Sequence, residues 1–194
     1  IGGFFALLFL YLSILIAFHA ALLGSGILAK EERDKTAEFL IVKPVSRSAV
    51  LTAKLLAALV NVVVLNAVTL ISSVFMVRAY SGGKDITGEI VLFFVSLLFV
   101  QLIFLALGVW IAASMKSPKG SGSVAAGIVL GAYIVAEITS VDDRLDALNV
   151  LSPFKYFSYD RIVAGNGLDP GVAVLSFLLA AAFTALAYFF YRKR

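Results

Sequence analysis

Residues 90–115 read IVLFFVSLLFVQLIFLALGVWIAASM, a run without one charged side chain. The run lacks the apolar–polar alternation that a strand of a membrane barrel needs. At about 1.5 Å of rise per residue, an apolar helix of roughly 20 residues crosses a hydrocarbon core of about 30 Å. This stretch is therefore long enough for a transmembrane helix, and it predicts that the chain folds in a membrane.

Further long apolar runs lie on both sides of this stretch. Hydrophobic residues make up 61% of the chain and charged residues 14%, against about 25% charged in typical globular domains. In lipid, backbone groups must be satisfied within helices or a closed barrel. We therefore predict one all-α domain, a polytopic helix bundle over residues 1–194, with five transmembrane helices at approximately 4–29, 55–77, 90–115, 120–141 and 170–191.

The positions of the basic residues predict the orientation of these helices. Of the 16 Lys and Arg residues, six lie in 30–54, two in 116–119 and three in 192–194. The other five lie in the alternating loops, together with most of the acids. Because cytoplasmic loops are enriched in Lys and Arg, we expect a multi-pass protein of the cell membrane with a cytoplasmic C-terminus. Five spans then place Ile1 outside, so we expect a further span before it and six in the full protein.

The charged segment 30–54 carries the most specific pattern. Its first half is helix-competent, and Pro44 should end that helix because proline has no N–H and disfavours helical geometry at the residue before it. Ser46 is then well placed as the N-cap of the next helix, which runs on into the second span. The pattern predicts a short helix on the membrane surface, a sharp break and a membrane-crossing helix.

These residues resemble a known family, the ABC-2 type transporter permeases. The resemblance lies in Glu31-Glu32-Arg33, Thr36-Ala37-Glu38-Phe39-Leu40, Lys43-Pro44-Val45-Ser46-Arg47 and Lys54, which look like that family's connection between its second and third spans. It continues in Leu151-Ser152-Pro153-Phe154-Lys155-Tyr156 and in the basic end Arg192-Lys193-Arg194. Ala37 beside Lys35 departs from the family, which often has Gly before the Thr.

The resemblance implies a permease subunit of an exporter that dimerises and binds a separate ATP-hydrolysing subunit through a coupling helix. It assigns the contact with that ATP-binding subunit to Glu31, Glu32, Arg33, Thr36, Glu38 and Arg47. It implies no cofactor on this chain, with ATP and Mg on the partner, and no nucleic-acid partner. Without the resemblance, the same charges could simply fix the topology of a solvated loop.

The loop 142–169 is longer and more apolar than a simple connection between two membrane spans needs to be. Its aromatic residues favour short helices at or in the outer membrane interface, where such rings are favoured. In the resembled family this region closes the outer end of the pathway. The sequence leaves a structural plug and an aromatic anchor as equal alternatives.

Polar residues within the spans are candidates for function. Asn61, Asn66 and Gln101 could line a pathway or form hydrogen bonds between helices, and Glu137 is expected at the level of the lipid headgroups. Glycines predict close helix approaches, at Gly24, Gly26 and the pair Gly127 and Gly131.

Several classes of function are excluded by what the sequence lacks. No phosphate-binding loop of the Gly-x-x-x-x-Gly-Lys-[Ser/Thr] type is present, so no ATPase activity is expected on this chain, and it is not predicted to be an enzyme. It has no cysteine and one histidine, too few for a zinc site. Two alternatives remain: a sensor or assembly factor that transports nothing and docks a partner through 30–54, and a secondary transporter, which would need buried acids.

Overall fold

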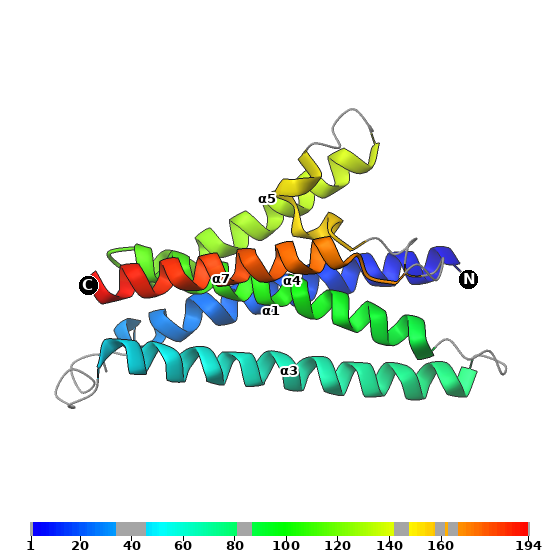
Figure 1. Cartoon of the computed structure of the whole chain (residues 1–194), viewed down its shortest axis with the longest axis horizontal. Coiled ribbons are helices and arrows are strands. Elements are labelled where there is room, and N and C mark those ends of the chain that lie inside the picture. Colours follow the sequence, from blue (N-terminus) through cyan, green and yellow to red (C-terminus); the bar gives the residue numbers. More distant parts are fainter. Residues whose placement is uncertain are drawn as a thin grey trace.

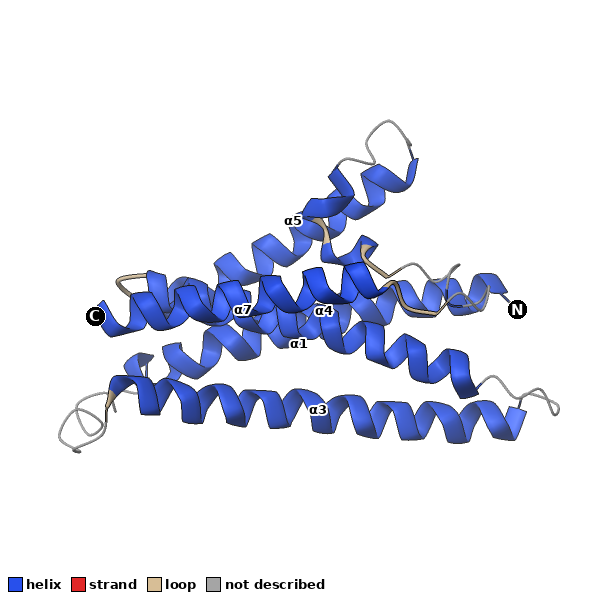
Figure 2. Cartoon of the chain, in the orientation of Figure 1, coloured by secondary structure: helices blue, strands red, loops and turns tan. Residues whose placement is uncertain are grey.

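The computed structural model describes residues 2–33, 46–80, 87–141, 148–157, 162 and 167–193. In this part of the chain the regular elements are helices and none is a strand (Figure 2). The predicted all-α membrane bundle is confirmed. Its long helices are α1 (Gly2–Arg33), α3 (Arg47–Tyr80), α4 (Thr87–Ser114), α5 (Ser121–Val141) and α7 (Pro170–Lys193), and the short 3-10 helices η1 (Pro118–Gly120) and η3 (Pro153–Lys155) lie between them.

The long helices extend along the long axis of the molecule, and the two chain ends lie at opposite ends of it (Figure 1). Five of the described helices are long and apolar enough to cross a membrane. The end where α1 stops and α3 starts is also the end where α7 stops, so α1, α4 and α7 run in one direction and α3 and α5 in the other (Figure 1). Helix α5 diverges from the other helices as it runs away from the end where α7 stops (Figure 1).

Helix α4 is the centre of the bundle. In its most apolar stretch 56% of the residues are buried, against 11% for α3 and for α7. Phe104 and Ile103 are each 1% exposed, although both lie in the middle of a run that would suit contact with lipid on every side. The other helices surround α4, which explains why the decisive run of the sequence is apolar all round.

The backbones of α1 and α4 cross in close contact at two glycines. A Cβ added at Gly24 would lie 2.3 Å from the carbonyl oxygen of Leu105, and a Cβ added at Gly108 would lie 2.3 Å from the carbonyl oxygen of Ala21. Each glycine therefore leaves room for the backbone of the other helix, one turn before the glycine of that helix. Small residues at an interface allow helices in membranes to approach in this way.

The close approach predicted at Gly24 is confirmed, but the described residues show no close approach at the other three predicted glycines. Nothing described lies within 4 Å of a Cβ added at Gly26, Gly127 or Gly131. A glycine permits a close approach without causing one, because the path of the neighbouring helix decides whether a backbone arrives there. The partner glycine on α4, Gly108, carried no signal of its own in the sequence analysis.

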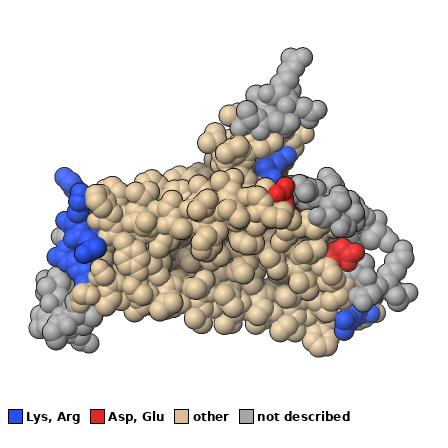
Figure 3. All heavy atoms as spheres, in the orientation of Figure 1, with Lys and Arg blue, Asp and Glu red and all other residues tan. Residues whose placement is uncertain are grey.

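Charge is segregated between the two ends of the molecule (Figure 3). One end, which we call the basic end, carries described side chains of Lys30, Arg47, Lys54, Lys116, Lys119, Arg192 and Lys193. The acidic side chains that the structure describes, Glu89, Glu137 and Asp169, lie at or towards the opposite end, with Arg78 and Lys155. The broad band between the two ends is free of described charges, as expected for surface in contact with hydrocarbon.

Candidate coupling site and buried polar pair

The predicted coupling segment lies at the basic end. Glu31, Glu32 and Arg33 form the last turn of α1, and Arg47 is the exposed first residue of α3. The side chains of residues 31–33 and the whole of 34–45, including Thr36 and Glu38, lie outside the described residues. The two helices flanking this segment start and stop side by side at one end of the bundle (Figure 1).

Helix α3 begins at a side-chain cap, as the sequence predicted. The hydroxyl oxygen of Ser46 accepts a hydrogen bond from the backbone N–H of Ala49 at 3.2 Å, and the carbonyl of Ser46 accepts one from Val50 at 3.1 Å. Such a cap satisfies one of the N–H groups that a helix start leaves unpaired. From this start α3 continues for 34 residues without a break, so the predicted continuity between the cap and the membrane span is confirmed.

The first two turns of α3 are fastened to two other helices. Lys54 donates from Nζ to the carbonyl oxygen of Ile27 on α1 at 2.6 Å. The hydroxyls of Thr52 and Tyr188 on α7 form a hydrogen bond at 2.7 Å. Leu51 is completely buried in an apolar cluster with residues of α1, α4 and α7. The base of α3 is thus held on three sides.

These fastening contacts were not foreseen from the sequence. Lys54 was noted only as part of the resemblance, and Thr52 and Tyr188 were not singled out. A hydroxyl pair 136 residues apart leaves no local signal, because neither residue departs from the pattern of its own helix. Only the arrangement of the helices brings them together.

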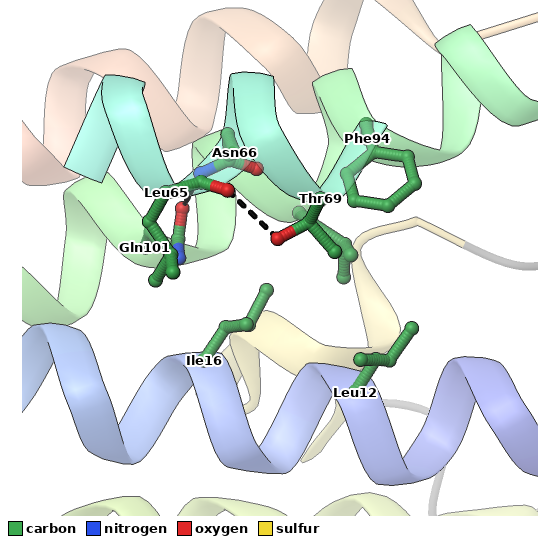
Figure 4. Close-up of a pocket in the computed structure, with 8 residues that line it drawn as sticks. Leu12, Ile16, Leu65, Asn66, Thr69, Phe94 and Gln101 are labelled. Atoms are coloured by element: carbon green, nitrogen blue, oxygen red, sulfur yellow. Dashed lines mark hydrogen bonds between the residues drawn. The ribbon is translucent and has the colours of Figure 1, made fainter. Parts of the chain in front are cut away.

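Two of the four predicted polar residues in the spans meet at the middle of the bundle. The Nδ2 group of Asn66 donates to Oε1 of Gln101 on α4 (Figure 4). It also donates to the carbonyl oxygen of Val62 at 3.0 Å. Gln101 is completely buried. The bond supports the reading of these residues as interhelical contacts. Asn61, in contrast, is exposed on the outer surface of α3, and Glu137 is exposed towards the opposite end of α5.

The described part of the outer loop enters the bundle. The hydroxyl of Ser152 donates to the carbonyl oxygen of Ala132 on α5 at 2.8 Å. The ring of Phe154 lies 5.3 Å from that of Phe104, and the ring of Phe157 stacks on Phe99 at 5.6 Å. Because Phe104 lies past the midpoint of α4, the second half of the segment 148–157, from Ser152 to Phe157, reaches deep between α4 and α5 (Figure 1), whereas Val150 and Leu151 are exposed. These aromatic side chains fill the bundle and do not lie along its surface.

A hydrogen bond between two residues of this segment also stabilises its fold. The hydroxyl of Tyr156 donates to the carbonyl oxygen of Val150 at 2.6 Å. Burial raises the pKa of this phenol, because a phenolate would lose solvation. The hydroxyl therefore remains a donor throughout the physiological range of pH.

No metal site emerges from the described side chains. Groups of three or more His, Cys, Asp or Glu residues that could hold a metal ion do not occur among them. At the basic end the structure shows a capped, continuous helix whose first two turns are hydrogen-bonded to α1 and α7.

A comparison with protein families gives an independent result for the whole chain. A family described as "ABC-2 family transporter protein" matches residues 5–194. No curated protein matches the chain.

Proposed function

Because this chain belongs to the ABC-2 family of transporter proteins, we propose that it is the membrane subunit of an ATP-driven exporter. Two permease copies work with separate ATP-binding subunits, which carry the ATP and Mg. The basic end faces the cytoplasm, where Lys and Arg are enriched in membrane proteins, and the C-terminus lies on the same side.

The proposed coupling runs from segment 30–47 into α3. The ATP-binding subunit contacts Glu31, Glu32, Arg33, Thr36, Glu38 and Arg47. Its movement on ATP hydrolysis tilts α3, and a changed tilt alters the space between helices that substrate passes through. The permease makes no chemical step of its own.

One observation carries this proposal. The charged connection leads through a capped start into a helix of 34 residues. That helix has an exposed first residue, Arg47, and a base hydrogen-bonded to α1 and α7. A force that the ATP-binding subunit exerts on segment 30–47 therefore acts on the long helix α3. The permease family supplies the context in which such an element has a partner.

Charge reversal tests the assigned contact. We expect the triple variant Glu31→Lys, Glu32→Lys and Glu38→Lys to lose the ATP-binding subunit during affinity purification from native membranes. Its substrate-dependent ATPase activity in liposomes should fall with it, because like charges now oppose the partner surface. The single variant Glu89→Lys is the matched control, since Glu89 is an exposed acid in the first turn of α4 at the opposite end.

To separate a local effect from a change in net charge, the single variants Glu31→Lys, Glu32→Lys and Glu38→Lys are each compared with Glu89→Lys, because each of these changes alters the net charge equally. Glu89→Lys should retain the partner and its ATPase activity. A triple variant that assembles and hydrolyses ATP like the unmodified protein would contradict the assignment of residues 31–38 to the partner contact.

A further inference from the structure

A small pocket lies beside the buried amide pair, between α1, α3 and α4. It is lined by Asn66 and Thr69 of α3, by Gln101 of α4 and by apolar side chains that include Leu12 and Ile16 of α1 (Figure 4). Its volume is about 10 Å³, close to the minimum for one water molecule. Nothing larger fits without a movement of the helices.

One donor of a residue that lines this pocket has no hydrogen-bond partner in the part of the chain that the structure describes. The Nε2 group of Gln101 is buried and makes no hydrogen bond with any described residue, and the whole side chain is 0% exposed. An unpaired buried amide donor destabilises the folded protein, because it has lost its hydrogen bond to water without gaining another. That destabilisation is removed if a small acceptor occupies the pocket.

The orientation of the amide follows from its neighbour. Asn66 must present nitrogen to the carbonyl oxygen of Val62, which can only accept. The same nitrogen donates to Gln101, so Gln101 presents its oxygen to Asn66 and its nitrogen elsewhere. The unpaired donor is therefore not the result of an arbitrary amide flip.

A second polar group is available on the same face of α3. The hydroxyl of Thr69 donates to the carbonyl oxygen of Leu65 at 2.7 Å, which leaves the hydroxyl oxygen able to accept. Thr69 follows Asn66 by one helical turn and lines the same pocket. A water molecule could accept from Gln101 and donate to Thr69, and it would then have the two or more partners that buried waters need.

We propose that this pocket binds one ordered water molecule, which joins Gln101 of α4 to Thr69 of α3 in the middle of the membrane. The site adds a second polar link to the direct bond between Asn66 and Gln101. It does not depend on the direction of transport or on an ATP-binding partner.

Selective labelling gives a direct test, because Gln101 is the sole glutamine of the chain. The protein is labelled with ¹⁵N at the glutamine side-chain amide, placed in lipid nanodiscs and examined by ¹⁵N-edited NOE and rotating-frame NOE spectroscopy. We expect magnetisation transfer from water to the Nε2 protons, with the opposite signs in the two experiments that identify a bound water and exclude proton exchange.

Two variants remove the site in different ways. Thr69→Val deletes the acceptor with little change of shape, and Ile16→Phe fills the pocket; each should abolish the water signal. Thr184→Val is the matched control, since Thr184 on α7 makes the same kind of bond to its own helix, at 2.8 Å to Ala180, and it should leave the signal unchanged. The proposal is overturned if the unmodified protein shows no transfer from water, if Nε2 contacts lipid chains or a second protein copy, or if the signal survives both pocket variants.

Discussion

The crossing of α1 over α4 depends on single hydrogen atoms at Gly24 and Gly108. The atoms opposite each glycine belong to backbone and not to flexible side chains, because Leu105 and Ala21 present their carbonyl oxygens there. A methyl group at either position must push the helices apart. The sequence predicts a close approach at Gly24, but it does not identify Gly108 as the partner, because only a contact between two helices distinguishes this glycine from any other.

We therefore expect Gly24→Ala and Gly108→Ala each to lower the free energy of unfolding by about 1–3 kcal/mol, the usual cost of overpacking. Unfolding in mixed detergent micelles, followed by loss of helical circular dichroism, measures the change. Gly26→Ala and Gly127→Ala are the controls, because nothing described lies within 4 Å of their added methyl groups. Equal losses of unfolding free energy in all four variants would show that the close contact between α1 and α4 does not cause the loss.

The amide pair gives a second prediction for single residues. Interhelical hydrogen bonds in membranes contribute about 0.6 kcal/mol on average and up to about 2 kcal/mol. We expect a double-mutant cycle with Asn66→Leu and Gln101→Leu to give a coupling energy in this range, measured by the same unfolding assay. A cycle of Asn61→Leu with Gln101→Leu should give none, since Asn61 is exposed on α3. Zero coupling for Asn66 as well would contradict the pair.

At the scale of the elements, the sequence predicts which segments form helices better than it predicts which helices contact one another. Long charge-free runs suffice to predict helices in lipid, where backbone groups must be satisfied internally. Ser46 could be predicted as a cap because capping is local. The insertion of residues 148–157 could not be decided, since aromatic residues such as Phe154 and Phe157 suit both an interface and a protein interior. Their ring partners, Phe104 and Phe99, are on a distant helix.

The inserted segment should be held in place by its aromatic contacts. The chain has no cysteine, so Ser152→Cys creates a single thiol at a position that is 0% exposed. We expect this thiol to react slowly with a maleimide in purified protein. Adding Phe157→Ala should accelerate the reaction at least several-fold, because Phe157 is 5% exposed and stacked on α4.

A control variant shows whether the acceleration is local. Phe189→Ala removes an aromatic ring of similar size from α7, where Phe189 is 52% exposed, and should leave the reaction rate of the thiol at residue 152 unchanged. A thiol that reacts quickly before any ring is removed would contradict the inserted position of residues 148–157.

At the scale of the whole molecule, the separation of charge predicts which end can be reached from outside the cell. We expect a cysteine at Glu89 or Arg78 to react with a membrane-impermeant maleimide added to intact cells. A cysteine at Lys116 or Lys193, at the basic end, should react only after the membrane is permeabilised. The reverse pattern would place the coupling segment outside and contradict the proposed function.

The uncharged surface of α3 extends between Lys54 and Arg78, both of which are tied at their positions by hydrogen bonds to Ile27 and Thr87. At about 1.5 Å per residue this surface is roughly 36 Å long, more than the oily interior of an average bilayer. Tilting of the helix is one way to accommodate this surplus length, and lipids with shorter acyl tails would increase such a tilt. The thickness of the surrounding lipid therefore contributes to the angle at which α3 crosses the bilayer.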